Sequence, residues 1–260
     1  MVTMQVFYRV TDNTVEGIQG EIAREFPLTI FVNQQELATL LCIPNKLGPL
    51  VLGFLYLEGI IKDLQEVLLM RLCEEEGIAE VRLVHEPEIP SKRIYTSGCG
   101  RGVVFGLDPL PYLPVESEVK VEPEDILPMM KALYARAEVY RSSGGVHASA
   151  LSNGAEILVI AEDVGRNNTL DKIQGECLLR DISTEGKVLL TTGRISSEML
   201  LKAAKMRIPL LISRTSPTDL AVKLADKLNI TLIGYARGKS FTIYSRPFRV
   251  MPQDHSLITL

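Results

Sequence analysis

The sequence predicts an α/β protein with a mixed, mostly parallel sheet flanked by helices and a smaller α+β domain at the N-terminus. In the second half of the chain, short apolar runs alternate with segments of helical periodicity. The proline-rich segment 108–114 interrupts any regular element and separates two patterns. With 260 residues, 46% of them hydrophobic and 23% charged, the chain can bury one large core or two modest ones. We therefore expect an α+β domain over residues 1–115 and an α/β domain over residues 116–260.

The first half combines strand patterns with one apolar helix. Its first residues alternate like a strand, and two further strand patterns flank an Asn-Gln-Gln turn. The apolar stretch that follows is too short and too interrupted by glycine and proline to span a bilayer, so we expect a buried helix that ends at Gly59. The expected elements are strands at residues 27–32 and 36–41, a helix at 49–58 and a strand at 80–84.

The second half begins with an amphipathic helix whose apolar positions run from Ile126 to Ala137. After a turn at residues 142–145, four short apolar runs alternate with three helical segments. This order predicts a parallel or mostly parallel sheet with right-handed crossovers. The expected strands span residues 157–161, 188–191, 210–213 and 231–234, and the helices lie near 168–180, 196–206 and 217–228.

The turns after three of these strands each contain one arginine close to a helix start: Arg166, Arg194 and Arg214. In an open parallel sheet such turns gather at one edge, where helix N-termini offer free backbone N–H groups to anions. One surface arginine is usually just solvated, but three at equivalent positions predict a phosphorylated ligand. A basic turn after the last strand could be an ordinary hairpin or could close on the same ligand. It consists of Tyr235, Ala236, Arg237, Gly238, Lys239 and Ser240.

Cys99 is the candidate reactive residue. It lies among small residues at positions 96–102, with Arg101 two residues away. A thiolate nucleophile needs an exposed, electropositive setting, which such a loop offers. By contrast, Cys42 and Cys177 lie in apolar patterns and are predicted to be core thiols.

His147 follows two glycines and precedes a run of small residues. It could act as a base or touch a ligand at the predicted site. A lone histidine among small residues is more often a hydrogen-bonded structural residue, and both interpretations stay open.

Composition narrows the classes of function. A formal net charge of -4 argues against broad contact with nucleic acid. The four cysteines show no CxxC spacing and no histidine partners at zinc-finger distances, which favours a reduced, cytoplasmic protein without a metal site. We find no leader pattern and no membrane-spanning stretch in the sequence. The positive mean hydropathy suggests apolar surface that a homodimer would cover.

Several motifs together resemble one family. The motifs are the Cys99 loop and further segments in both halves of the chain, and together they extend over roughly residues 20–250. The chain resembles the FdhD family, the sulfur carrier proteins required for formate dehydrogenase activity. The matching segments are EDVGRNNTLDK at 162–172, SGGVHASA at 143–150, TGRISSEM at 192–199, and the N-terminal segments 25–30, 32–33 and 53–61.

The resemblance implies a function, a substrate and partners. Members of this family take sulfur from a cysteine desulfurase as a cysteine persulfide. They pass it to the molybdenum bis(molybdopterin guanine dinucleotide) cofactor of formate dehydrogenase. Cys99 falls on the persulfide position and residues 235–240 on the cofactor-binding segment, and the core of the family resembles the cytidine deaminase fold. The pyrophosphates of such a cofactor agree with arginines at several helix starts.

The chain departs from the family pattern at two positions. Many relatives have a second cysteine three residues after the first, where this chain has Gly102, so Cys99 would have to transfer sulfur without a resolving partner. Members commonly carry His where this chain has Asn167, which weakens any acid–base role for that turn.

Two other functions compete with sulfur transfer. A zinc nucleobase hydrolase needs a His-x-Glu or Cys-x-Glu element and a later Pro-Cys-x-x-Cys, and the sequence contains neither. A noncatalytic chaperone that binds the pterin dinucleotide, with Cys99 uninvolved, stays open. Replacement of Cys99 by alanine would separate this alternative from a sulfur carrier.

Overall fold

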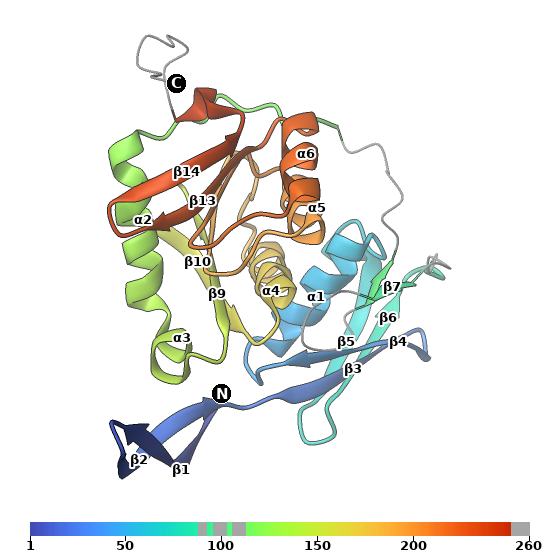
Figure 1. The fold of residues 1–260 in the computed structure, drawn as a ribbon. Coiled ribbons are helices and arrows are strands. Elements are labelled where there is room, and N and C mark those ends of the chain that lie inside the picture. Colours follow the sequence, from blue (N-terminus) through green and yellow to red (C-terminus); the bar gives the residue numbers. More distant parts are fainter. Residues whose placement is uncertain (88–92, 96–102, 106–112, 251–260) are drawn as a thin grey trace.

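The computed structural model describes residues 1–87, 93–95, 103–105 and 113–250. Cys99, on which the sequence-based hypothesis depends, lies outside the described residues. Figure 1 shows the described elements as layers of helices and sheets, with a hairpin that projects from one end. No helix in the described part of the chain has the length and apolar character needed to cross a membrane.

The largest sheet has six strands in the order β10-β9-β11-β12-β13-β14. Strands β10 to β13 all point the same way, but only the pairings β11–β12 and β12–β13 are parallel. The sheet is therefore mixed, as predicted, whereas the expectation of mostly parallel pairing is wrong. The bounds are β9 (His147–Ser152), β10 (Ile157–Asp163), β11 (Val188–Thr191), β12 (Leu210–Ser213), β13 (Thr231–Arg237) and β14 (Ser240–Ser245).

Strand β9 causes the difference, because it runs antiparallel between β10 and β11. Its sequence, His-Ala-Ser-Ala-Leu-Ser, contains small residues of low strand propensity, and all but His147 are buried. Burial between two neighbouring strands overrides that weak local preference. The sequence pattern therefore gave no strand signal at this position.

Helices cover both faces of this sheet (Figure 1). On one face α2 packs against Leu190 and Ile212, and on the other face α4, α5 and α6 pack against the alternate residues Leu189 and Leu211. The helix after β12 begins later than expected, because Thr218 caps it through a bond from the Ala221 N–H. The bounds are α2 (Pro123–Arg136), α3 (Glu138–Ser143), α4 (Arg166–Leu179), α5 (Ser197–Lys205) and α6 (Asp219–Lys227).

A second layer lies in the N-terminal half, where α1 separates a four-stranded sheet, β4-β3-β6-β5, from α4. Helices α1 and α4 meet at glycines: a Cβ on Gly53 would lie 1.8 Å from the Asp171 carbonyl oxygen, and one on Gly175 would lie 1.8 Å from that of Pro49. No side chain fits at either position. The bounds are β3 (Phe26–Val32), β4 (Gln35–Cys42), α1 (Leu47–Glu58), β5 (Val67–Cys73) and β6 (Ile78–Leu83).

The remaining elements are short or peripheral. The first two strands form the projecting hairpin through a two-residue turn at Asp12 and Asn13, both with positive φ. They are β1 (Val2–Thr11) and β2 (Thr14–Ala23), and the others are η1 (Leu64–Glu66), β7 (Arg93–Tyr95), β8 (Val103–Phe105) and η2 (Pro247–Arg249).

Candidate functional site

The predicted turns meet at one edge of the six-stranded sheet. Strands β10 to β13 end at this edge, and β9 begins there because His147 pairs with Asp163. The turns that follow β10, β11 and β12 therefore converge, as expected for the carboxyl ends of strands that point the same way. This edge is the candidate site.

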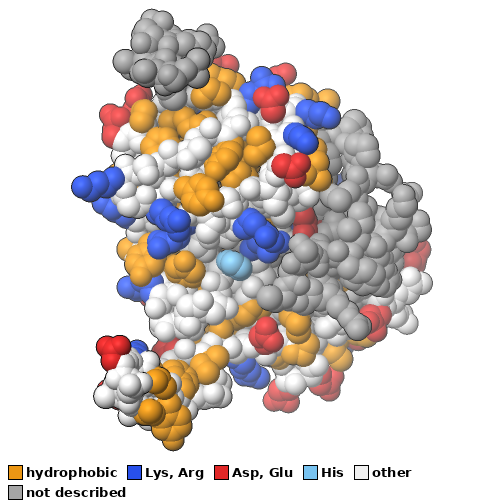
Figure 2. Space-filling view, viewed as in Figure 1, with side chains coloured by type: hydrophobic (Ala, Val, Ile, Leu, Met, Phe, Trp, Pro, Cys, Tyr) orange, Lys and Arg blue, Asp and Glu red, His pale blue; other side chains and the backbone are white. Residues whose placement is uncertain are grey.

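A cavity of about 630 Å³ opens beside this edge, between α2 and the β13–β14 hairpin. Its lining includes residues 236–240 and the basic side chains of Lys131 and Arg214. With Arg237 and Lys239 the cavity has four cationic groups, and among the described residues no Asp or Glu lines it. Figure 2 shows Lys and Arg side chains gathered with hydrophobic ones on the face seen there. The charge of the cavity favours an anionic ligand.

The β13–β14 hairpin carries the basic turn into the cavity. Arg237 pairs with Ser240, so the turn contains two residues, and Gly238 adopts φ 65°. A bulge lies between Gly234 and Arg237, where Tyr235 has φ 52°. The segment is thus both a hairpin and part of the cavity, so the two interpretations of its sequence are compatible.

Arg214 lies in the cavity wall after β12. Its backbone N–H donates to the Thr191 carbonyl oxygen at 3.0 Å, and its guanidinium carbon lies 5.8 Å from the centre of the Tyr134 ring. Tyr134 and Lys131 come from α2 and were not among the predicted site residues. The apolar positions of α2 predicted only which face of the helix packs against the core. Nothing in the sequence showed that Lys131 and Tyr134, beside that face, would meet the β13–β14 hairpin.

His147 and Arg166 meet beside Gly193. A Cβ on Gly193 would lie 3.1 Å from the Arg166 Cβ and 3.4 Å from His147 Nδ1, so a larger residue would crowd both side chains. Burial lowers the pKa of His147, the positive charge of Arg166 lowers it further, and Asp163 opposes the change. His147 is therefore neutral at pH 7 and can accept or donate a hydrogen bond without adding charge.

Buried hydroxyl groups hold the corner formed by His147, Arg166 and Gly193 in place. Ser149 Oγ lies 2.7 Å from Thr169 Oγ1 and donates to Thr191 Oγ1 at 2.9 Å. Thr191 Oγ1 in turn accepts the Gly193 N–H at 3.1 Å, and Thr169 Oγ1 donates to the Arg166 carbonyl oxygen at 2.6 Å. The network fixes the backbone of two of the converging turns.

A buried ion pair holds α4 against the end of β10. Lys172 Nζ lies 2.6 Å from Asp163 Oδ2, and neither side chain is exposed to solvent. Asp163 also accepts the N–H groups of Ile43 and Gly165, while Lys172 donates to Asn45 Oδ1 at 2.7 Å. These contacts join the N-terminal layer to the edge of the sheet that forms the site.

Not every predicted residue lies at the cavity. Arg194 is exposed and does not line it. Tyr235 is also outside the lining, although the guanidinium of Arg237 lies 5.5 Å from its ring centre. Arg166 and His147 lie at the neighbouring corner around Gly193, and Thr192 connects that corner to the cavity by accepting the Ala148 N–H at 3.0 Å.

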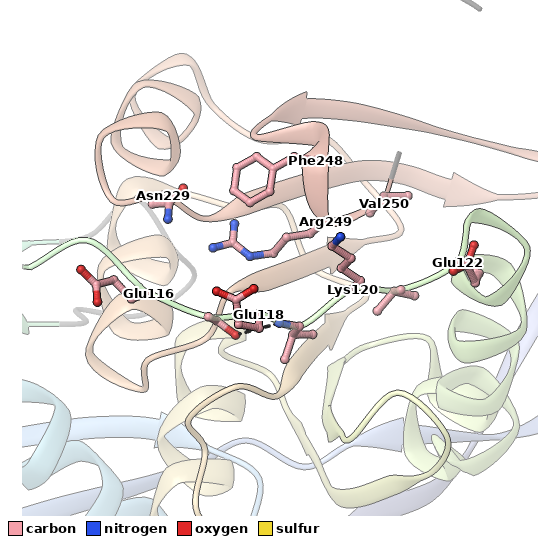
Figure 3. Close-up of a pocket in the computed structure, with 11 residues that line it drawn as sticks. Glu116, Glu118, Lys120, Glu122, Asn229, Phe248, Arg249 and Val250 are labelled. Atoms are coloured by element: carbon pink, nitrogen blue, oxygen red, sulfur yellow. Dashed lines mark hydrogen bonds between the residues drawn. The ribbon is translucent and has the colours of Figure 1, made fainter. Parts of the chain in front are cut away.

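A second cavity, of about 650 Å³, lies between residues 116–122 and the C-terminal η2 turn. Figure 3 shows Arg249 extending along it, with Phe248 above and Glu118 and Lys120 on the opposite segment. Arg249 is buried, and its guanidinium donates to the Val115 carbonyl oxygen at 3.3 Å and to Thr231 Oγ1 at 3.4 Å. These contacts attach the segment that begins at Val115 to the α/β layers, which is a structural role.

The fold and the site define an α/β protein with a basic, anion-suited cavity at the edge of a mixed sheet. The model of the FdhD/NarQ family matches residues 23–251, and the chain belongs to that family. The sulfur carrier protein FdhD of Bacillus subtilis (strain 168) is 37% identical over 249 residues, which cover 94% of this chain and 95% of the relative. The sulfur carrier protein FdhD of Geobacillus kaustophilus (strain HTA426) is 40% identical over 240 residues, with 90% and 91% covered.

A crystal structure from Desulfotalea psychrophila, assigned as a formate dehydrogenase accessory protein, has the same fold. It superposes with a TM-score of 0.78 at 25% sequence identity, and the match covers 96% of this chain and 99% of that one. The family resemblance inferred from the motifs is thus confirmed.

Proposed function

We propose that this chain is a sulfur carrier that receives sulfur on Cys99 from a cysteine desulfurase. It delivers the sulfur to the molybdenum bis(molybdopterin guanine dinucleotide) cofactor of formate dehydrogenase. Relatives named sulfur carrier protein FdhD support the carrier role. The observation that carries the cofactor half of the proposal is the cavity lined by Arg214 and residues 236–240, because its cationic groups suit the pyrophosphates of a dinucleotide.

The chemistry of the first step needs no external oxidant. The Cys99 thiolate attacks the outer sulfur of a persulfide on the desulfurase, a new S–S bond forms, and the desulfurase cysteine leaves as a thiolate. In the second step the outer sulfur passes to the cofactor, which is the substrate here. Two electrons from a reduced molybdenum centre convert that sulfur to sulfide, and Cys99 returns to the thiolate.

The other described cysteines show which thiols are unreactive and which one can serve as a control for Cys99. Burial, reinforced by Asp163, raises the pKa of Cys42 to about 12, and burial, reinforced by Glu176, raises the pKa of Cys177 to about 12. Both thiols are therefore protonated and unreactive at neutral pH. Cys73 at the end of β5 is the exposed cysteine among the described residues, which makes it the matched control for Cys99.

The test is formate dehydrogenase activity in cells that depend on this chain. We expect Cys99→Ala to abolish that activity, because no second cysteine stands at Gly102 to take over the transfer. Cys73→Ala should leave the activity unchanged. Full activity with Cys99→Ala would contradict the carrier proposal and favour the noncatalytic chaperone.

The same proposal includes a cytoplasmic location and a core related to the cytidine deaminases. A reduced compartment keeps Cys99 available as a thiolate, which supports the cytoplasmic assignment. The deaminase-like core and the division into domains 1–115 and 116–260 stay predictions.

A further inference from the structure

The two walls of the basic cavity differ in chemistry. Helix α2 contributes four lining residues at the spacing i, i+3, i+4 and i+7, so they lie on one face of the helix. They are Leu127, Met130, Lys131 and Tyr134. The other wall is the turn of the β13–β14 hairpin at residues 236–240, and Figure 1 shows α2 beside this hairpin. The α2 wall is thus largely apolar and aromatic, whereas the hairpin wall is basic.

Tyr134 is the aromatic residue of the α2 wall, and its neighbours hold its ring. The rings of Tyr134 and Tyr140 meet edge to face, with their centres 6.2 Å apart and their planes at 86°. On another side the guanidinium carbon of Arg214 lies 5.8 Å from the centre of the Tyr134 ring. Tyr134 nevertheless keeps 46% of its surface exposed. The ring is therefore positioned in advance and still accessible to a ligand.

Leu127 and Met130 extend the apolar surface of this wall. Met130 is buried in the cluster of side chains between α2 and the six-stranded sheet, and Leu127 packs against the same cluster. A thioether and an aliphatic side chain make favourable contacts with a flat aromatic ring. They offer no donor to a phosphate, which loses free energy when it is buried without hydrogen bonds.

The hairpin wall suits a phosphate instead. Arg237 and Lys239 flank Gly238, and a Cβ placed on Gly238 would meet no atom within 4 Å, so the turn is open around this residue. Arg214 lies between the two walls, because it lines the cavity and also approaches the Tyr134 ring. Cationic side chains of this kind bind phosphate oxygens through charge-assisted hydrogen bonds.

We propose that the α2 wall is a nucleobase subsite, in which a base stacks on Tyr134 and lies along Leu127 and Met130. The phosphates of the same nucleotide then reach Arg214 and residues 237–239. This inference rests on the proposed binding of a guanine dinucleotide and adds the orientation of that ligand. Proteins bind exposed bases by stacking them on aromatic rings and guanidinium planes. A cavity of about 630 Å³ also lies within the range of about 300–1,000 Å³ that is usual for small-ligand sites.

Tyr134 can be replaced without a large effect on the fold. The buried residues of α2 are Ile126, Met129, Met130 and Leu133, and Tyr134 lies outside this set. Substitutions of exposed residues on a helix usually change stability little. Circular dichroism of each variant would check that the fold is retained.

Isothermal titration calorimetry with guanosine diphosphate and with inorganic pyrophosphate tests the proposal. In Tyr134→Leu the dissociation constant for guanosine diphosphate should rise at least about fivefold, because the stacking surface is lost. Pyrophosphate has no base, so its dissociation constant should stay within about twofold of the wild-type value. Tyr134→Phe is the matched control, because it keeps the ring and should bind both ligands as the wild type does.

A fluorescent variant reports the stacking itself. The chain contains no tryptophan, so Tyr134→Trp introduces a single fluorophore at the subsite. Guanosine diphosphate should quench its emission, because a stacked base lies against the indole ring. Pyrophosphate, which binds without stacking, should leave the emission unchanged.

Four results would overturn the subsite. Equal losses of both ligands in Tyr134→Leu would mean that Tyr134 acts only by holding Arg214. Full binding of guanosine diphosphate by Tyr134→Leu, or binding to Tyr134→Trp without quenching, would place the base elsewhere and leave the proposed cofactor cavity intact. A wild type that binds neither ligand would contradict the subsite and the cofactor half of the proposed function, whereas sulfur transfer to Cys99 is measured separately.

Discussion

Arg214 is the residue that connects the buried framework to the cavity. Its backbone is fixed by Thr191, and its guanidinium is held against the Tyr134 ring, so little freedom is lost when it binds an anion. Arg194 comes from an equivalent turn and is a natural comparison, because it is exposed outside the cavity.

We expect Arg214→Ala to weaken binding of guanosine diphosphate, used as a probe for the dinucleotide, by about 10- to 100-fold. That range corresponds to the loss of one hydrogen bond to a charged group, about 1.5–3 kcal/mol. Isothermal titration calorimetry would measure the change, with Arg194→Ala as the control that should bind as the wild type does. Equal losses in both variants would place the anion site elsewhere.

The pKa values of the two described histidines are shifted in opposite directions. Burial and Arg166 lower the pKa of His147, whereas the hydrogen bond that His85 donates to Glu66 raises the pKa of His85. In an NMR titration His147 should therefore change protonation at lower pH than His85, with each signal assigned by its His→Gln variant. The reverse order would contradict the buried setting of His147.

The lowered pKa of His147 also affects stability. The unfolded chain binds a proton on His147 more tightly than the folded chain does. The contribution of His147 to the free energy of unfolding is therefore highest above about pH 6.5, where His147 is neutral in both states, and it falls as the pH drops below that value. His147→Gln should accordingly lose less stability than the wild type between pH 7 and pH 5. Thermal unfolding at both pH values would measure the difference.

Among the elements, the contact between α1 and α4 imposes the strictest steric requirement. The backbones approach so closely at Gly53 and Gly175 that each added Cβ would overlap a carbonyl oxygen. We expect Gly53→Ala to destabilise the fold by about 1–3 kcal/mol or more, as overpacking does. Urea unfolding would measure this loss.

Gly48→Ala in the same helix is the matched control. Its added Cβ would lie 3.3 Å from the end of the flexible Met70 side chain, so we expect a change within about 1 kcal/mol. If both alanine variants were equally stable, the close approach of α1 and α4 would be wrong.

The elements also show what the sequence could and could not predict. The strands β10 to β13 were predicted because each is a continuous apolar run, and α5 was predicted from the helical pattern near residues 196–206. In the structure Ser196 caps α5 by accepting the Met199 N–H. Strand β9 was missed because its small residues become strand-like only through burial between β10 and β11. Lys131 and Tyr134 were missed because helical periodicity identifies a packed face but not what the adjacent side chains meet.

At the scale of the whole molecule, the site depends on contacts between distant segments. Lys172 joins the loop after β4 to the end of β10, and Arg249 joins Val115 to β13. Buried charges of this kind give no periodic signal in a sequence. Arg214 and residues 236–240 nevertheless line one cavity, because the turns of an α/β sheet converge wherever its strands point the same way.

The central claim is that Cys99 carries sulfur, and intact-protein mass spectrometry tests it most directly. After incubation with a cysteine desulfurase and cysteine, the wild type and Cys73→Ala should each gain the mass of one sulfur atom, removable by a thiol reductant. Cys99→Ala should gain none. A gain that persists in Cys99→Ala, or no gain in the wild type, would contradict the account.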